Sequence, residues 1–315
     1  MDYVKPGEVL TAMIETGENK ARLGILQMLA KGFLGGSILA FATTLAFTAT
    51  QQTSLGIVGA LIFPVGFVII VLLGLELVTG SFALIPLAVL ERKVPLSRML
   101  ANFGWVILGH LIGCAVYAIL YGLTITKMGA DFSHPLIQTI IQTSEAKTVA
   151  YKHMGGSGLA LVTIKAVLCN WMVTLGVVMG MTSRSTAGKI AAMWLPILIF
   201  FAQGFEHAVV NMFIIPAGMM LGANVSFADW WVWNQIPVLI GNFLGGVVFT
   251  GLLLYVSQKG KGLAVEDNAR AAMAGPERSA VSTAPSALAS SGANAPDEPE
   301  RRGVPANPAG AGNSL

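Results

Sequence analysis

The stretch GLELVTGSFALIP at residues 74–86 decides the fold of this chain, because it returns as GFEHAVVNMFIIP at residues 204–216. Glycine, glutamate, isoleucine and proline recur in register between the two copies, which makes them an internal repeat. Each copy places a carboxylate and small or polar residues in the middle of an apolar run. Positions that face lipid exclude such groups, so these side chains must face protein or water.

The segment around the first copy is too long to be one straight membrane helix. Glu76 is the only charged residue between Leu55 and Leu90, and no polar loop divides this run into two. A single span needs about 20 residues. A helix interrupted half-way across fits both facts, and paired interrupted helices in two halves of a chain indicate a transport site at the bilayer midplane.

The composition is that of a polytopic membrane protein. Of the 315 residues, 54% are hydrophobic and only 11% are charged, which is outside the range of soluble domains. The formal charge of +3 says little about partners, since the side of the membrane on which Lys and Arg lie matters more. Cys114 and Cys169 both sit inside apolar segments, so we expect them to pack in the core and to form neither a disulfide nor a metal cluster.

We predict six membrane spans in two halves. They cover about 29–50, 55–90, 103–123, 159–181, 190–221 and 235–256, with a polar connection at 124–157. GHLIG at 109–113 parallels GNFLG at 241–245, so the repeat extends over three spans in each half, about 29–123 and 158–256. Because three is odd, the second half must be inverted relative to the first. The predicted fold is an all-α membrane protein with six transmembrane helices in an inverted 3+3 repeat, in which helices two and five are broken at mid-membrane.

Two further segments flank the transmembrane transport domain, which we expect to cover 29–257. Residues 1–28 are expected to form an amphipathic segment on the membrane surface. Residues 258–315 are rich in Ala, Ser, Pro and Gly, so we expect a disordered tail with no role in transport. Most Lys and Arg of the folded part lie on the side of the N-terminus, which predicts a plasma (inner) membrane protein with cytoplasmic N- and C-termini.

Ionisable groups inside the predicted spans need a reason, since each costs at least about 2.5 to 3.5 kcal/mol in the hydrocarbon region. Glu76 and Glu206 either accept hydrogen bonds from backbone N–H groups freed at the breaks or handle ions directly. Lys165 either draws anions into a vestibule or reaches up to the lipid headgroups. The residues alone leave both interpretations open in each case.

His207 differs from its repeat mate Leu77, although the structural residues around them agree between the copies. A departure in one copy alone suggests a function. Imidazole titrates near neutral pH, so His207 could give a proton or a hydrogen bond to an anion at a central site. The alternative is a neutral histidine bonded to Glu206 or to a carbonyl group.

Other polar and aromatic residues lie near the breaks. Asn170 and Asn211 can bond to interrupted backbone, and Thr79 stands at the first break. Aromatic side chains precede or surround both breaks, namely Phe63, Phe67, Phe200, Phe201 and Phe205. Such rings either pack in the core or form a hydrophobic constriction above a polar centre.

Three motifs, in this order, resemble the formate/nitrite transporter family over Met1 to about Ser257. They are GLELVTG at 74–80, LCNWMV at 168–173 and GFEHAVVNMF at 204–213. The resemblance implies an aquaporin-like fold, a homopentamer with one pore per protomer, and passage of small monovalent anions such as nitrite, formate, hydrosulfide or lactate. MDY at 1–3 and AMIETG at 12–17 resemble the nitrite-transporting branch, which favours nitrite as the substrate.

The same resemblance implies roles for individual residues. His207 would be the central histidine, with Thr79 as its partner on the break of helix two. Their supporting shell would be Glu206, Asn170 and Asn211. An anion-attracting lysine is expected at the outer vestibule, for which the candidates are Lys147 in the family-like stretch SEAK at 144–147, Lys152 and Lys165. Two constrictions are expected, an outer one of Phe63, Phe67 and Phe200 and an inner one of Leu77, Val78 and Val173.

Crossing an apolar throat costs much more for a bare anion than for its neutral, protonated acid. We therefore expect an outer lysine to concentrate the anion, which picks up a proton in or near the centre with the assistance of His207. The neutral acid then passes the constrictions. The expected partners are the small anion and membrane lipid, and we expect no cofactor, no enzymatic activity and no nucleic-acid partner.

Two other functions remain open. A membrane redox protein could use His110 and His207 as haem ligands, although neither span carries a second histidine at ligand spacing. A neutral-solute channel of the water or glycerol type should carry Asn-Pro-Ala at the start of both half-helices. Neither VTG at 78–80 nor VVN at 209–211 supplies that motif.

Overall fold

The computed structural model describes residues 2–259, and all but the first two residues of the expected tail lie outside that range. Apart from one isolated bridge between Tyr3 and Ser183, the regular structure of these residues is helical. The first half contains α1 Pro6–Ala21, α2 Ile25–Thr53, α3 Gly56–Ile62, α4 Pro64–Leu72, α5 Val78–Leu90 and α6 Leu96–Ile125. The second contains α7 Pro135–Ala146, α8 Val149–His153, α9 Gly156–Met181, α10 Thr186–Ala202, α11 Ala208–Leu221, α12 Phe227–Trp230, α13 Ile236–Gly246 and α14 Leu253–Gln258, with the π-helical turns η1 Trp231–Gln235 and η2 Val247–Leu252.

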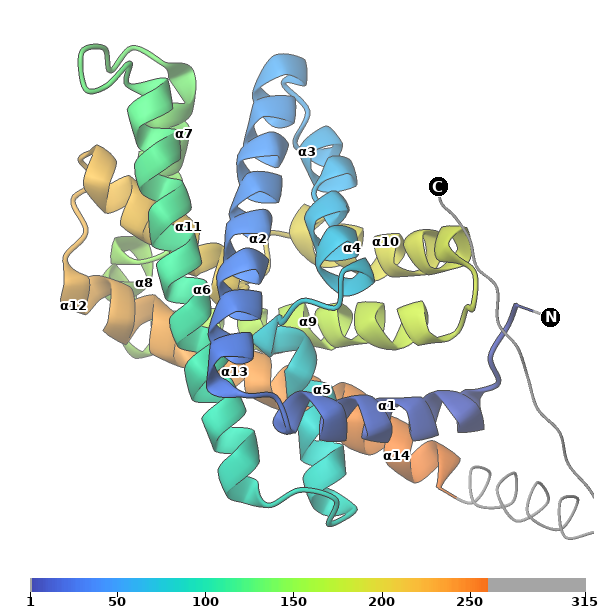
Figure 1. Ribbon diagram of the computed structural model, residues 1–315. Helices are drawn as coiled ribbons and strands as arrows, with labels where there is room; N and C mark the ends of the chain where they lie inside the picture. Colours follow the sequence, from blue (N-terminus) through green and yellow to red (C-terminus); the bar gives the residue numbers. More distant parts are fainter. Residues whose placement is uncertain (1, 260–315) are drawn as a thin grey trace, which may run out of the picture. The chain divides into compact units, whose positions relative to one another are not determined.

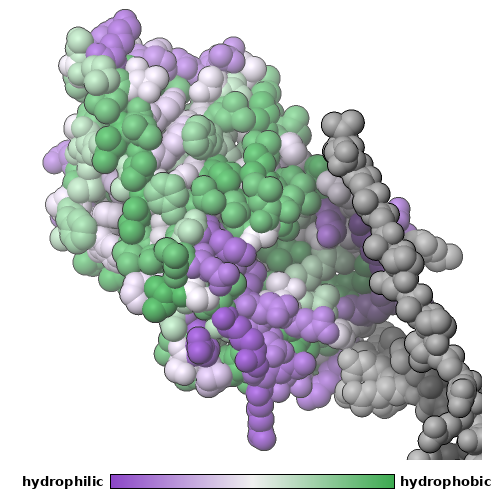
Figure 2. Space-filling model, viewed as in Figure 1, coloured by the Kyte–Doolittle hydropathy of each residue, from purple (hydrophilic) through white to green (hydrophobic). Residues whose placement is uncertain are grey.

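Within residues 2–259, four helices are long and apolar enough to cross a membrane: α2, α6, α9 and the continuous helix Phe227–Gln258. They contain the predicted first, third, fourth and sixth spans. Figure 2 shows hydrophobic side chains over the middle of the face formed by α2 and α6, with hydrophilic ones gathered towards its two ends. The exposed side chains there include Leu34, Phe41, Leu108 and Ile112. An apolar surface of this kind is suited to contact with lipid or with another protein.

The two long helices of each half run side by side in the same direction (Figure 1). α2 packs on α6 through glycines, because a Cβ on Gly32 would lie 2.7 Å from the carbonyl oxygen of Val106 and one on Gly36 would lie 2.7 Å from that of His110. α9 packs on α13 in the same order, through the glycines of α13. Small residues let helix backbones approach this closely. Because the two long helices of each half are parallel, the chain between them must cross back once. The interrupted helix of each half forms this return.

Both interrupted segments break at a glycine in the left-handed conformation. Gly74, between α4 and α5, has a φ of 61°, and Gly204, between α10 and α11, has a φ of 62°. The next N–H bonds back to the helix that has ended, from Leu75 to the Ile70 oxygen at 3.0 Å and, in the second copy, from Phe205 to the oxygen of Phe200 at 3.2 Å. This arrangement closes a helix with a Schellman motif. The predicted interruptions are therefore confirmed, and the repeated glycine is what ends each first half-helix.

Two amphipathic helices occupy corresponding places in the two halves. α1 packs along α5, and α7 packs along α11. The expected surface segment at 1–28 thus forms α1 and the start of α2. The expected polar connection at 124–157 is only partly a loop, because α7 within it buries Leu136, Ile137 and Ile140.

Both ends of the described chain lie on the α1 side of the fold. The N–H of Val4 donates to the carbonyl oxygen of Thr182, which follows α9, at 2.8 Å. At the other end, the Tyr255 hydroxyl of α14 bonds the carboxylate of Glu91, which follows α5. Figure 1 shows α1 and α14 close to α5 at this end of the long helices.

Gly113→Ala should lower the melting temperature of the detergent-purified protein. Its Cβ would collide with the carbonyl oxygen of Phe33 on α2, and overpacking of this kind typically costs about 1–3 kcal/mol. Gly122→Ala on the same helix is the control, since nothing lies within 4 Å of its Cβ and alanine favours a helix. Equal melting temperatures for the two variants would contradict the close packing of α2 on α6.

Candidate functional site

A histidine and a threonine from the two breaks meet in the centre of the protein. His207 immediately precedes α11, and its Nδ1 accepts a hydrogen bond from the N–H of Val210 at 3.3 Å. Its Nε2 lies 3.0 Å from Oγ1 of Thr79 in the first turn of α5. Because Nδ1 accepts, a neutral ring carries its proton on Nε2 and donates it to Thr79. Both side chains are almost completely buried, and the two halves each supply one of them.

The carboxylate of Glu206, next to His207, is buried among side-chain donors. It accepts hydrogen bonds of 2.8 Å each from Lys147 Nζ, Tyr151 OH and Asn211 Nδ2, and a longer one from Asn234. A buried charge is tolerated when it is paired and hydrogen-bonded in this way. Lys147 therefore neutralises Glu206, and Tyr151 and Asn211 hold it in place.

One interpretation of Glu76 and Glu206 was that they accept hydrogen bonds from backbone N–H groups freed at the breaks. Among the described residues this interpretation is wrong. Glu76 pairs with Lys20 of α1 at 2.8 Å and accepts from the hydroxyl of Ser81 at 3.3 Å, and Glu206 takes the side-chain donors above. No backbone N–H donates to either carboxylate within residues 2–259. The two carboxylates are instead members of ion pairs with lysines from the amphipathic helices.

A cavity of about 440 Å³ opens next to α7, here called the α7 cavity. It is lined by Lys147, Lys165, Tyr151, Glu206 and residues of α7 and the second break. Lys165 Nζ lies 3.4 Å from the hydroxyl of Tyr151. Lys152, the third candidate for an anion-attracting lysine, does not line this cavity, because it forms a 2.7 Å ion pair with Asp229.

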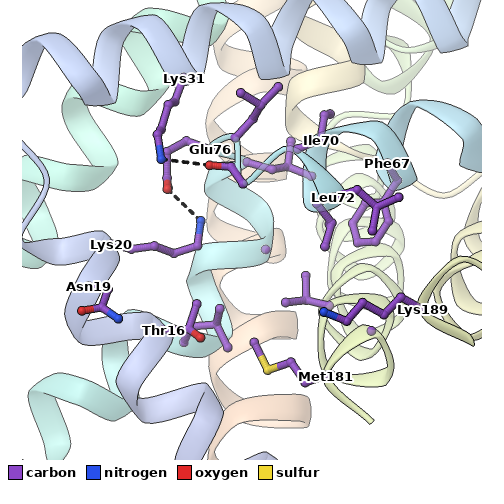
Figure 3. Close-up of a pocket in the computed structure, with 18 of the residues that line it drawn as sticks. Thr16, Asn19, Lys20, Lys31, Phe67, Ile70, Leu72, Glu76, Met181 and Lys189 are labelled. Carbon is purple, nitrogen blue, oxygen red and sulfur yellow. Dashed lines mark hydrogen bonds and ion pairs between the residues drawn. The ribbon is translucent and has the colours of Figure 1, made fainter. Parts of the chain in front are cut away.

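A second cavity of about 390 Å³ opens next to α1, here called the α1 cavity (Figure 3). Three lysines line it, Lys20, Lys31 and Lys189. Lys20 holds Glu76, and Lys31 donates to the carbonyl oxygen of Gly74 at 3.0 Å, so two of the three reach the first break. The lysines expected to attract anions, Lys147, Lys152 and Lys165, all belong to the other side, so the three lysines of the α1 cavity were missed.

A second, shorter repeat would have revealed Lys20. IETGENK at 14–20 corresponds to IQTSEAK at 141–147, with isoleucine, threonine, glutamate and lysine in register. The pairs Lys20–Glu76 and Lys147–Glu206 are therefore repeat mates, at 2.8 Å each. Lys31 and Lys165 also correspond, since Lys31 directly precedes Gly32, whose carbonyl oxygen bonds His110, and Lys165 directly precedes Ala166, whose carbonyl oxygen bonds Asn242.

Aromatic rings lie against the central histidine. The ring of Phe200 stacks on that of His207 with centroids 5.6 Å apart, and the edge of Phe63 meets Phe200 at 5.7 Å. Phe67 departs from the expected outer constriction, because it lines the α1 cavity together with Leu77. Val78 and Val173, expected at the inner constriction, are fully buried and line neither cavity.

Asn170 and Asn211 support the centre from two directions. Asn170 Nδ2 donates to the carbonyl oxygen of Thr79 at 3.0 Å and so fixes the backbone of the first break. Asn211 Nδ2 donates to Glu206 and to Asn234 Oδ1, at 2.8 Å each. Of the expected central group, His207 and Thr79 touch each other, while Glu206, Asn170 and Asn211 hold the elements that carry them.

Known proteins with similar sequences span nearly the same length. An uncharacterized transporter of Bacillus subtilis, YrhG, is 35% identical over 265 residues, which covers 82% of this chain and 94% of that protein. The formate channel BtFdhC of Bacillus thuringiensis is 29% identical over 261 residues, covering 81% of this chain and 96% of that protein. The formate channel FocA of Escherichia coli K12 is 29% identical over 279 residues, covering 81% and 94%.

Solved structures share the fold. An ion channel of the FNT family superposes with a TM-score of 0.65 at 23% identity, covering 79% of this chain and 98% of that one. A pentameric formate channel with formate bound superposes with a TM-score of 0.59 at 24% identity, covering 74% and 96%. The family model described as formate/nitrite transporter matches residues 7–256. The match extends over both halves, both breaks and both ion pairs, so this chain is a multi-pass membrane protein and a member of the formate/nitrite transporter family.

Proposed function

We propose that this chain moves small monovalent anions of weak acids across the membrane, past the Thr79–His207 pair. The observation that carries this proposal is the position of that pair, which is buried between two half-helix starts, with a lysine-lined cavity on the side of each amphipathic helix. Lysines attract an anion, a narrow apolar centre rejects its charge, and the histidine offers a donor where the charge is hardest to carry.

The proposed route runs between the α7 cavity and the α1 cavity, past both breaks. We propose six membrane crossings in an inverted, aquaporin-like repeat, with the breaks at mid-membrane and the α1 cavity facing the cytoplasm. The excess of Lys and Arg on the α1 side supports this orientation in a plasma membrane. The pentameric solved channel supports a homopentamer with one such route in each protomer.

Lys165 and Lys147 differ in what they can do for an anion in the α7 cavity. Lys147 is already paired with Glu206, so that carboxylate largely neutralises its charge. Lys165 forms no ion pair among the described residues and donates only to a tyrosine hydroxyl at 3.4 Å. We therefore assign the attraction of anions on this side to Lys165, and on the α1 side to Lys31 and Lys189.

The hydrogen bonds of His207 define what it can contribute. With Nδ1 accepting from Val210, the ring is neutral and offers a single N–H, now given to Thr79. A neutral imidazole does not release that proton near neutral pH, so the proton that neutralises the anion must come from water in the cavity. His207 then assists by giving the passing acid a hydrogen bond and by remaining uncharged itself.

Formate is the substrate we put first. Two of the named relatives are formate channels, and one solved relative holds formate. The nitrite expected from the N-terminal residues has no support among those names and stays a prediction. Both anions are small, singly charged and planar, so the same route suits them, and both should be measured.

For the haem alternative, each ring nitrogen of His110 and His207 already has a protein partner, which leaves none for iron.

Formate uptake into proteoliposomes should rise as the external pH falls, because more protons are available to neutralise the anion. His207→Ala removes the central hydrogen-bond donor, so we expect slower uptake at every pH, while the rise towards low pH remains because the proton comes from water. His153→Ala, which changes an exposed histidine of α8, is the matched control and should behave as wild type. Uptake that depends neither on pH nor on His207 would refute this role, and vesicles that pass glycerol but neither formate nor nitrite would favour a neutral-solute channel.

Lys165→Gln should slow initial formate uptake roughly threefold at low ionic strength, because one attracting charge is lost from the α7 cavity. The difference from wild type should shrink in 0.15 M salt, where the attraction between exposed charges more than about 8 Å apart is largely screened. Lys152→Gln, which changes a lysine outside the cavity, is the control. A salt-independent loss would show that Lys165 does not act through its charge.

Lys147→Met should strongly destabilise the protein, because it leaves the buried carboxylate of Glu206 without its cation, a change that typically costs about 3–5 kcal/mol. The double variant Lys147→Met, Glu206→Gln should regain much of that loss, since neither charge remains. Thermal melting in detergent compares wild type, the single variants Lys147→Met and Glu206→Gln, and the double variant. Additive losses in the double variant would mean that the two residues are not coupled.

A further inference from the structure

We propose that His110 is a positioning residue: it caps α5 from the neighbouring helix α6 and thereby holds Thr79 at the right place for His207. This inference rests on the proposed transport past the Thr79–His207 pair, and it concerns a histidine that the proposed route itself does not use. The argument depends on two hydrogen bonds in the first half and on their counterparts in the second.

Both nitrogens of the His110 ring bond to backbone. Nδ1 lies 2.7 Å from the carbonyl oxygen of Gly32 on α2, and Nε2 accepts from the N–H of Val78 at 3.1 Å. A carbonyl can only accept and an N–H can only donate, so the ring is neutral, with its proton on Nδ1. The side chain is fully buried, and it joins three elements: α2, α6 and the start of α5.

The bond to Val78 satisfies a helix terminus that would otherwise be left without a partner. Val78 is the first residue of α5, and the first N–H groups of a helix have no partner within it. A side chain that accepts from one of them acts as an N-cap. Leu77, the residue in the N-cap position, has no polar side chain, so the cap comes from His110. The next residue is Thr79, whose hydroxyl touches His207.

The second half contains the same device built from a different side chain. Asn242 occupies the place of His110 in the repeat, and its Oδ1 accepts from the N–H of Ala208, the first residue of α11, at 2.9 Å. Its Nδ2 donates to the carbonyl oxygen of Ala166 at 2.8 Å, as His110 donates to Gly32. The two side chains share one acceptor and one donor contact and nothing else. Capping is therefore the common function, and it requires no titratable group.

Asn242 has one further contact that His110 lacks. Its Nδ2 also donates to the carbonyl oxygen of Glu206 at 2.9 Å. An amide carries two N–H groups, whereas a neutral imidazole carries one. Asparagine can thus perform the task of His110, but histidine cannot perform the whole task of Asn242. The exchange of the two residues should be tolerated in one direction only.

The experiment compares His110→Asn, His110→Leu and Asn242→His by two independent measurements. The first is formate uptake into proteoliposomes, and the second is amide hydrogen exchange of the peptide covering residues 73–82, which reports opening of the start of α5. We expect His110→Asn to stay within about twofold of wild type in both. His110→Leu should lose about tenfold in uptake and gain a similar factor in exchange, because a buried N–H loses its acceptor. Asn242→His should lose more uptake than His110→Asn.

The outcomes separate this inference from the proposed function. If His110→Asn loses as much uptake as His110→Leu while exchange stays as in wild type, His110 acts through its own proton and the inference is wrong. Unchanged exchange in His110→Leu would also overturn it. If His110→Leu does not fold, His110→Asn decides alone. Wild-type uptake and exchange in that variant support the cap, and loss of both overturns it. If wild type transports neither formate nor nitrite but the exchange pattern holds, the proposed function fails and the cap stands.

Discussion

Backbone groups freed in the middle of an apolar layer must find partners inside the protein, and this constraint governs the structure. Each break leaves the end of one half-helix and the start of another without intrahelical bonds. The ends are closed by the left-handed glycines Gly74 and Gly204. The starts are closed by side chains from other helices or from the break itself, namely His110, Asn242 and His207. The polar centre of the protein is made up of the side chains that provide these hydrogen bonds.

The two halves share a cap from the neighbouring helix, His110 of α6 or Asn242 of α13, and an additional cap in the second half places the chemistry. In the second half, His207 caps its own helix and still offers an N–H to Thr79. In the first half, the corresponding residue is Leu77, and a histidine from α6 closes the helix. The carboxylates remain symmetric, since Glu76 and Glu206 are both paired with a lysine of an amphipathic helix. Symmetry thus builds the scaffold, and one asymmetric position supplies the donor.

The breaks and the unusual histidine could be predicted from the sequence because they depend on local chemistry. A glycine that ends a helix, a carboxylate in an apolar run and a histidine in only one copy are visible without coordinates. The pairing of Thr79 with His207 was implied by the resemblance to the formate/nitrite transporter family, and the structure places Thr79 Oγ1 and His207 Nε2 3.0 Å apart. Lys20 was missed although its repeat is present, because it lies in a segment that looks like an ordinary surface helix.

The lining of the cavities could not be predicted, because it depends on how the helices pack against one another. Phe67 was expected beside Phe63 and Phe200, yet it turns to the α1 cavity. Lys152 has the spacing of an anion-attracting residue but finds Asp229 instead. Which side chains line a cavity is decided by packing over tens of residues.

The short pairing of the N-terminal residues with the turn after α9 affects how the protein can be handled. Tyr3 forms a β-bridge with Ser183, and the N–H of Arg184 donates to the carbonyl oxygen of Asp2 at 2.9 Å. These bonds anchor the start of α1, and the end of α1 carries Lys20. An affinity tag or fluorescent fusion joined at this end would therefore press on the same helix that neutralises Glu76.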